Sequence, residues 1–218
     1  MRKPLSIAVL LWTLVCTDAW AGAYEDFFMA IHQDNPTAVA GLIERGLDPN
    51  TVDPSGQPAL LLALRLKSVK VALYLARVGS ADVEVRSAQD ESPLMLAALR
   101  GYADICVALL ERDSDVNKPG WTPLHYAATA GHVNIIALLL EKHAYIDASS
   151  PNGSTPLMMA AMYGSLESVK ALLDAGADAA IQNDLGLTAL DFAKRGNKPD
   201  AAELLAAHVR KAVTGGTW

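Results

Sequence analysis

Residues 120–128 read Gly-Trp-Thr-Pro-Leu-His-Tyr-Ala-Ala, and close copies of this stretch recur further along the chain. Residues 153–161 read Gly-Ser-Thr-Pro-Leu-Met-Met-Ala-Ala, and residues 186–193 read Gly-Leu-Thr-Ala-Leu-Asp-Phe-Ala. The threonines of the three stretches lie 33 residues apart. Because a fixed period of about 20 to 50 residues is typical of solenoids, propellers and arrays, this repeat decides the fold.

Weaker copies of the same frame lie upstream, at residues 92–98, 58–63 and 25–30. The frames begin near residues 25, 58, 92, 122, 155 and 188, with steps of 33, 34, 30, 33 and 33 residues. A second landmark, a turn residue after an apolar helical run, keeps the same phase at Gly46, Gly79, Asp113, His143 and Gly176. Two landmarks in one phase indicate consecutive units rather than a chance pattern.

The residues of the frame fit two short helices joined by a tight turn. A proline at the first helical position loses no hydrogen bond, because the first amides of a helix have no partner within it. The threonine before the proline is placed to cap the helix, and the alanine pair lets neighbouring helices approach closely. Gly101, Gly131 and Gly164 are expected to end the first helix of their units in the left-handed region, which favours glycine.

The frame resembles the ankyrin repeat, in which Thr-Pro-Leu-His is followed by an alanine pair, Gly-His, a leucine-rich helix and Gly-Ala-Asp. The motif residues that carry this resemblance are Thr122, Pro123, Leu124, His125, Gly131, His132, Thr155, Pro156 and Gly164. The resemblance covers roughly residues 24–210, and we assign residues 22–210 to one repeat domain. It implies an all-α ankyrin-repeat solenoid of about six helix-turn-helix units with short hairpin-like loops. His125 is expected to bond to Thr122 and to backbone, and His132 to tie adjacent loops.

Departures from the frame predict local differences between the units. The first and last units carry more charge and are expected to cap the stack. Lys67-Ser68 replaces the usual Gly-His, so the turn of the second unit is expected to be looser. The step of 30 residues is expected to shorten the loop before Trp121 and leave that residue beside a gap in the row. Residues 211–218 are assigned to a flexible tail.

The first residues of the chain have the pattern of a secretory signal peptide. Arg2 and Lys3 precede an uncharged apolar run of 11 residues, which is too short to span a bilayer. Cleavage is predicted after Ala21, with Ala23 as the alternative site. A lipoprotein built on Cys16 and a retained anchor are the other interpretations. No later stretch is long and apolar enough to span a membrane, so no membrane association is expected of the mature form.

Composition argues against several classes of function. The chain has 18 basic and 24 acidic residues, for a net charge of -6, which argues against nucleic-acid binding. Its two cysteines exclude a four-cysteine zinc site, and Cys106 lies in an apolar run typical of a buried thiol. No nucleophile elbow, phosphate-binding loop or zinc-protease motif occurs in the sequence. We therefore expect no enzymatic activity, no cofactor and no metal.

The resemblance implies a protein-binding face made of loop tips and the exposed side of the first helices. The predicted positions are Glu91, Leu99, Arg100, Trp121, Tyr126, Thr129, Ala130, Asn152, Ser154, Met159, Met162 and Tyr163. Aromatic residues dominate interface energetics, so Trp121, Tyr126 and Tyr163 are the candidate anchors. The alternative for the two tyrosines is that they only pack against the neighbouring unit.

The signal and the repeat together predict an exported binding module. The sequence resembles the small periplasmic ankyrin-repeat proteins of Gram-negative bacteria, some of which are linked to peroxide resistance through support of a catalase. We expect a monomer that binds a partner protein in the periplasm as an adaptor, a protective chaperone or an inhibitor, including an immunity protein. The alternative is a secreted effector that binds host proteins.

Overall fold

The computed structural model describes residues 22–215, and the side chains as far as residue 211. The predicted signal peptide and its cleavage after Ala21 lie outside the described residues. The chain divides into two compact structural units, each made of several repeats; the first ends at Asp82 and the second begins at Val83. The sequence analysis assigned both to one domain. Each unit is described by itself.

The first unit consists of two helical hairpins. A helix over residues 22–32 precedes α2 (Pro36–Glu44), and α3 (Ala59–Leu66) precedes α4 (Val69–Arg77). Between α2 and α3 a hairpin-like loop is closed by an antiparallel bridge between Val52 and Pro58. The core of this unit is apolar and includes the fully buried side chains of Phe27, Ile31, Leu61, Leu64 and Leu75.

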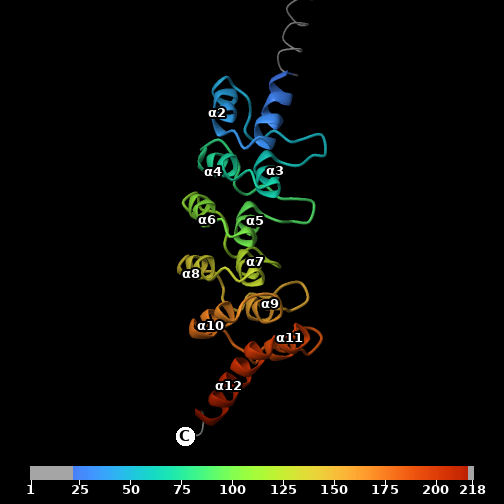
Figure 1. Cartoon of the computed structure of the whole chain (residues 1–218), viewed down its shortest axis with the longest axis vertical. Coiled ribbons are helices and arrows are strands. Elements are labelled where there is room, and N and C mark those ends of the chain that lie inside the picture. Colours follow the sequence, from blue (N-terminus) through green and yellow to red (C-terminus); the bar gives the residue numbers. More distant parts are fainter. Residues whose placement is uncertain (1–21, 216–218) are drawn as a thin grey trace, which may run out of the picture. The chain divides into compact units, whose positions relative to one another are not determined.

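The second unit stacks four further hairpins in two layers, which confirms the ankyrin-type helical architecture expected from the repeat (Figure 1). The first helices, α5, α7, α9 and α11, pack on one another in order, and α6, α8 and α10 form the layer beside them. The bounds of these helices are α5 Pro93–Arg100, α6 Ala103–Leu110, α7 Pro123–Ala130, α8 Val133–Glu141, α9 Pro156–Tyr163, α10 Leu166–Asp174, α11 Ala189–Arg195 and α12 Pro199–Gly215.

The first helices of the second unit start at capped residues. Ser92, Thr122, Thr155 and Thr188 are the N-caps of α5, α7, α9 and α11, and each accepts a hydrogen bond from the backbone of the third helical residue. Proline occupies the first helical position in α5, α7 and α9. Because a side-chain cap and a proline both favour helix initiation at one position, the sequence determines where α5, α7 and α9 begin.

Gly164 does not end its helix in the way the sequence analysis expected. Gly101 and Gly131 are left-handed, with φ of 78° and 75°, whereas Gly164 is extended, with φ of -75° and ψ of -160°. The reason lies in the next residue, because Ser165 caps α10 through a reciprocal pair of hydrogen bonds with Ser168. Ser165 is itself extended, with ψ of 162°, whereas Tyr102 and His132 at the same place in their repeats have ψ of 74° and 83°. The chain therefore enters α10 along a different path, and the prediction of a left-handed Gly164 was wrong.

Lys67 keeps the tight turn that the sequence analysis expected to loosen. Its φ of 64° and ψ of 28° place it in the left-handed region, and its amide bonds to the carbonyls of Ala63 and Leu64. Ser68 after it is buried, which fixes the direction of the chain into α4. Packing of the following helix therefore imposes on lysine a conformation that usually selects glycine.

We expect the Lys67→Gly variant to be more stable than the parent by about 1 kcal/mol, because glycine adopts the left-handed region without a steric penalty. Denaturant unfolding measures the change. Lys67→Ala is the matched control, since it removes the charge and keeps the penalty. An equal gain from both variants would show that the lysine charge, and not the backbone, is responsible.

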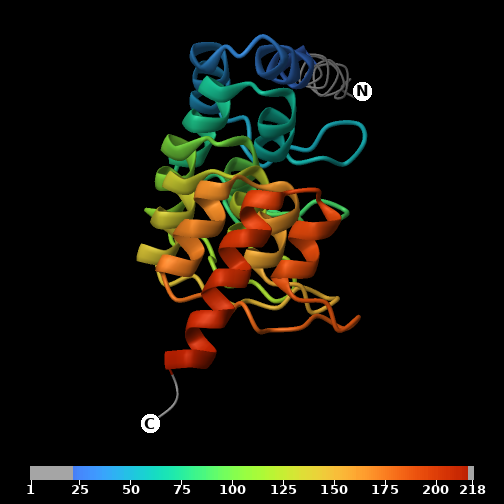
Figure 2. The ribbon, with the colours of Figure 1, turned by 60° about the horizontal axis from the view of Figure 1, so that its bottom comes forward.

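The last helix is longer than the sequence analysis allowed. α12 continues to Gly215, so residues 211–215, which were assigned to a flexible tail, are helical (Figure 2). Residues 199–214 are rich in alanine, leucine and other strong helix formers, and the first glycines of this segment are Gly215 and Gly216. Residues 216–218 lie outside the described residues. Within residues 22–215, no helix has the length and hydrophobicity needed to cross a membrane.

Side-chain hydrogen bonds link successive loops of the second unit. The Asn117 amide accepts from the Tyr145 backbone amide at 2.7 Å and donates to the His143 carbonyl at 2.8 Å. In the next repeat Asp147 takes the place of Asn117 and accepts a hydrogen bond from the Asp178 backbone amide at 3.1 Å. Unlike the amide of Asn117, its carboxylate has no hydrogen to donate in return. Burial, and secondarily the charge of Asp178, raises the pKa of Asp147. Asp147 is therefore a weaker link than Asn117.

We expect Asp147→Asn to stabilise the protein by about 1 kcal/mol at neutral pH, by adding a donor and removing a charge. A folded-state pKa above the unfolded value means that Asp147 favours folding at low pH and loses this contribution as pH rises. The gain should therefore shrink on acidification, as measured by denaturant unfolding at several pH values. A gain that is independent of pH would contradict this account.

Candidate binding surface

The loop that carries Trp121 is the shortest in its row. It runs over residues 111–122, whereas the neighbouring loops span residues 78–92 and 142–155. This difference agrees with the shortened step between the third and fourth units. Trp121 lies directly before the N-cap of α7, and its ring meets the His125 ring edge-on, with 5.2 Å between centroids.

His125 holds the base of this surface in place. The ring is fully buried, its Nδ1 accepts from the Thr122 amide at 3.2 Å, and its Nε2 lies 2.9 Å from the Ser154 carbonyl. Since an amide can only donate and a carbonyl can only accept, Nε2 carries the hydrogen. Burial lowers the pKa of His125 to about 4, so the ring is neutral at physiological pH. The geometry gives His125 a structural role.

In the neighbouring repeats a methionine takes the place of this histidine. The methionine makes only one of the two hydrogen bonds that the histidine makes, the one to the cap amide. The sulfur atoms of Met95 and Met158 lie 3.4 Å from the backbone nitrogens of Ser92 and Thr155. Thioether sulfur is a weak acceptor and has no donor. Of these three repeats, the one with His125 therefore couples its cap to the backbone of the next repeat, and the two with methionine do not do so through this side chain.

An apolar pocket opens on the exposed side of the first helices. It is lined by Leu99 of α5, Tyr126 and Thr129 of α7, Met159 of α9 and Trp121 of the loop before α7, and has a volume of about 220 Å³. The Thr129 hydroxyl donates to the His125 carbonyl at 2.7 Å, so that hydroxyl is satisfied within its own helix. The sequence analysis named all five residues among the predicted binding positions, and the structure brings them together.

Tyr126 connects this pocket to the loop before α5. Its hydroxyl donates to the Glu91 carboxylate at 3.3 Å, which places a carboxylate at the edge of the pocket. Burial, followed by the charges of Glu91 and Asp90, raises the pKa of Tyr126 to about 12. Tyr126 is half-buried, whereas Tyr163 is 56% exposed and so does not pack fully on its neighbour.

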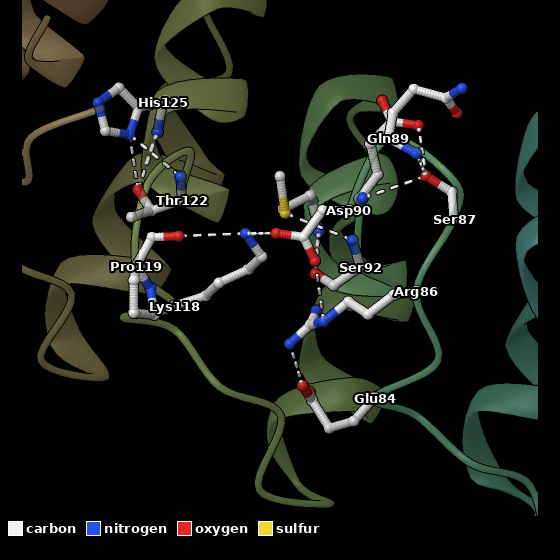
Figure 3. Close-up of polar contacts among 12 residues, drawn as sticks. Glu84, Arg86, Ser87, Gln89, Asp90, Ser92, Lys118, Pro119, Thr122 and His125 are labelled. Atoms are coloured by element: carbon white, nitrogen blue, oxygen red, sulfur yellow. Dashed lines mark hydrogen bonds and ion pairs between the residues drawn. The ribbon is translucent and has the colours of Figure 1, made fainter. Parts of the chain in front are cut away.

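The loop before α5 and the loop before α7 are joined by an ion-pair network (Figure 3). The Lys118 ammonium pairs with Asp90 and donates to the Pro119 carbonyl at 3.1 Å. Arg86 lies on the other side of Asp90, at 4.0 Å, and pairs with Glu84 at 2.7 Å. Lys118 is only 9% exposed, because its side chain lies between the two loops.

Further hydrogen bonds connect the same two loops and brace the first of them. Glu84 accepts from the Asp115 backbone amide at 3.1 Å, and the Ser87 hydroxyl accepts from the amides of Gln89 and Glu91. The sequence analysis missed this network. The only local signal is a lysine before proline in a shortened loop, and its partner lies 28 positions earlier in the chain.

The remaining predicted positions divide by exposure. Arg100, Ala130, Asn152 and Tyr163 are exposed, while Met162 is partly exposed. Ser154 is buried, and its amide bonds to the Ser150 hydroxyl at 3.0 Å while its carbonyl receives the His125 bond. Its placement on the exposed face was therefore wrong, because the histidine needs that carbonyl inside the stack.

The described residues contain no group of three histidine, cysteine, aspartate or glutamate side chains arranged to hold a metal ion. Cys106 is fully buried, and burial raises the pKa of its thiol to about 12. A thiol in that state reacts slowly, because the thiolate is the nucleophile.

Comparison with known proteins agrees with this architecture. The family model of ankyrin repeats (3 copies) matches residues 27–119, 78–150, 113–183 and 145–215, so the chain belongs to the ankyrin-repeat family. A crystal structure of an ankyrin repeat domain from Acinetobacter baumannii is similar, with a TM-score of 0.70 and 26% identity. The alignment covers 83% of this chain and 95% of that domain.

Two relatives show how widely the repeat is used. The chain is 32% identical over 162 residues to the B-cell lymphoma 3 protein homolog of Mus musculus, covering 71% of this chain and 36% of the relative. It is 31% identical over 172 residues to SH3 and multiple ankyrin repeat domains protein 2 of Homo sapiens, covering 77% of this chain and 9% of the relative. The chain thus spans a small part of these proteins. Membership of the family makes it a protein–protein interaction module.

Proposed function

We propose that this chain is exported to the periplasm and binds a partner protein there without catalysing a reaction. The observation that carries the proposal is the apolar pocket of Leu99, Trp121, Tyr126, Thr129 and Met159, which lies on the exposed side of α5, α7 and α9. A pocket with aromatic walls and a polar edge is the kind of site that receives an interface anchor. The ion pairs and hydrogen bonds of the loops beside it favour one loop conformation, which should reduce the entropy lost on binding.

Export is supported by the residues before the described part of the chain. A positive start, an apolar run and small residues around Ala21 are the three parts of a cleaved secretory signal. The resemblance to small periplasmic ankyrin-repeat proteins favours a role as adaptor, protective chaperone or inhibitor. Support of a catalase under peroxide stress and immunity against a toxin are the two specific forms of this role.

Fractionation of cells that express the tagged chain tests the location. We expect a form shortened at Ala21 or Ala23, recovered in the periplasmic fraction, with mass spectrometry defining the new N-terminus. Shortened protein recovered in the culture medium would favour the secreted effector instead. Full-length protein in the cytoplasm would contradict export.

Affinity capture from a periplasmic extract tests the binding function. We expect the parent to enrich one partner, and the Trp121→Ala, Tyr126→Ala double variant to lose at least about thirtyfold in affinity, since a hot-spot residue contributes about 2 kcal/mol or more. Tyr145→Ala is the matched control, because Tyr145 is an aromatic side chain that is 66% exposed and does not line the pocket. Equal capture by parent and double variant would show that another face binds.

A further inference from the structure

We infer that the exposed face of α4 binds an acidic amphipathic helix of a partner protein. The site is an open groove with a volume of about 350 Å³, lined by Lys70, Leu73, Tyr74, Arg77 and Val78. All five residues belong to the first unit, in α4 or at the residue that ends it. The inference goes beyond the proposed function, because the pocket that carries that function is lined by residues of the second unit.

The shape of the groove fits a helix. Residues four positions apart form ridges on the surface of a helix, and a ridge of a second helix packs into the groove between two of them. One ridge of α4 is formed by Lys70, Tyr74 and Val78. The other is formed by Leu73 and Arg77. A small molecule fits poorly, because such ligands are largely buried in concave pockets and a single helix supplies these walls.

The two ends of the groove are positively charged. Lys70 and Arg77 are exposed, and neither forms an ion pair among the residues that the structure describes. They lie seven positions apart, which corresponds to two helical turns and about 10 Å along the axis. Because charges across an interface tend to be complementary, the groove favours a partner helix with acidic side chains about two turns apart.

The carboxylates of the preceding hairpin leave these two cations unpaired. α2 packs on α4, and Asp34 precedes α2 (Figure 1). The Asp34 carboxylate accepts from the Val71 backbone amide at 2.9 Å, so it is bonded to the start of α4 and forms no ion pair with Lys70. Glu44 ends α2 and is exposed, and no ion pair joins it to Arg77 within the described residues. Both cations are therefore available to a partner.

The charge of this face is the reverse of the charge at the same helical positions in other repeats. Counted from the N-cap, the place of Lys70 is taken by Asp104 in α6 and by Glu167 in α10. The place of Arg77 is taken by Glu111 at the end of α6. Negative charge suits the first turn of a helix because of the helix dipole, so Lys70 is unfavourable for α4 itself. The stability of the helix therefore does not explain this lysine.

Basic residues extend over the whole hairpin of α3 and α4. Residues 54–81 form the longest stretch of the chain without an acidic residue, although the net charge of the chain is -6. The stretch carries Arg65, Lys67, Lys70 and Arg77. A local concentration of positive charge attracts an acidic partner over a distance and speeds its association.

Selection of a display library on the purified full chain tests the inference. The library consists of random peptides of about 20 residues, which are long enough to form a helix. Peptides that also bind the Lys70→Glu, Arg77→Glu double variant are removed by counter-selection. We expect the remaining peptides to share two acidic residues about seven positions apart, with apolar residues at helical spacing between them. Synthetic copies should become helical on binding, as measured by circular dichroism, and should bind more weakly as salt is raised.

The variants introduce residue types that the chain carries at the same helical positions, which guards against loss of folding. The Lys70→Glu, Arg77→Glu double variant should weaken peptide binding at least about tenfold, because two attractions become repulsions. Tyr74→Ala, which reproduces Ala108 of α6, should also weaken it about tenfold through loss of an apolar wall. Lys170→Glu is the matched control, since Lys170 is an exposed lysine of α10, and should bind as the parent does.

Denaturant unfolding separates binding from stability. Lys70→Glu should be at least as stable as the parent, because it places a negative charge in the first turn of α4. Lys70→Glu should nevertheless weaken peptide binding about two- to fivefold. Unchanged affinity in this variant would overturn the role of Lys70.

Two other occupants of the groove are tested directly. Vesicles of equal parts phosphatidylcholine and phosphatidylglycerol probe an anionic lipid surface, and sedimentation velocity of the chain alone probes a second copy. We expect the chain to remain unbound by the vesicles and to sediment as a monomer. Vesicle binding or a dimer that the Lys70→Glu, Arg77→Glu double variant abolishes would overturn the assignment to a partner helix.

The selection itself has outcomes that contradict the inference. These are the absence of any peptide after counter-selection, a basic consensus, or peptides that bind without becoming helical. The proposed function is tested separately, with the Trp121→Ala, Tyr126→Ala double variant. That variant should bind the acidic peptide as the parent does, so failure of one proposal is distinguishable from failure of the other.

Discussion

The Gly164→Ala variant is expected to lose about 3 kcal/mol of unfolding free energy, a large effect for the addition of a single methyl group. The cause is space and not backbone conformation, because the extended φ of Gly164 suits any residue. A Cβ atom there would clash with the Ala128 carbonyl oxygen and would lie 2.7 Å from the Ser168 hydroxyl and 2.9 Å from the Ala160 carbonyl. Two of these three atoms are backbone and cannot rotate away.

Gly176→Ala is the control for this substitution. Gly176 has a φ of +96°, and a Cβ atom added to it would meet nothing within 4 Å. Alanine at this position should cost about 1 kcal/mol through the backbone alone. Denaturant unfolding of the two variants gives the comparison. A Gly164→Ala variant as stable as Gly176→Ala would mean that the two adjacent hairpins can separate without loss.

The second large effect is the response of His125 to acid. The pKa of this group is lowered to about 4 in the folded state, because the ring is buried, and is near 6.5 in the unfolded chain. The unfolded state therefore gains a proton first as pH falls, and stability is lost between pH 6.5 and about 4. Each unit of pKa difference corresponds to about 1.4 kcal/mol, so the total loss approaches about 3 kcal/mol.

His125→Met separates this effect from the titration of carboxylates. Methionine occupies the equivalent position as Met95 and Met158, where its sulfur lies next to the cap amide. The variant loses the bond to the Ser154 carbonyl, so it should be less stable at pH 7 by about 1 kcal/mol. Its stability should also depend much less on pH between 6.5 and 4. Parallel pH profiles for the two proteins would show that His125 does not titrate as described.

The sequence predicts those parts of the fold that depend on local chemistry. The caps at Ser92, Thr122 and Thr155, each followed by proline, fix the start of a helix within a few residues of chain. The shortened loop before Trp121 could be counted directly from the repeat step. These features need no knowledge of what packs against them.

The errors arise where packing between units decides the conformation. Lys67 is left-handed because buried Ser68 and α4 require that turn, although lysine itself disfavours it. Gly164 is extended where Ser165, itself extended, begins the cap of α10, and the Ser-x-x-Ser spacing of Ser165 and Ser168 is the sequence signal of that cap. Ser154 is buried because its carbonyl receives the hydrogen bond of His125, which lies 29 positions earlier.

The candidate surface was only partly predictable for the same reason. Spacing within the repeat places Leu99, Tyr126 and Met159 on the same side of successive helices. The ion pair of Lys118 with Asp90 depends on the distance between two loops, which no helical period determines. Consequently the apolar wall of the pocket followed from the sequence, whereas the ion-paired loops beside it did not.

Hydrogen–deuterium exchange of the chain, alone and bound to the captured partner, tests most directly that the pocket face is the binding surface. Protection on binding is expected in residues 84–91 and 121–130, which carry the ion-paired loop beside the pocket and most of the pocket itself. Protection restricted to α6, α8 and α10, with no change in residues 121–130, would contradict the account.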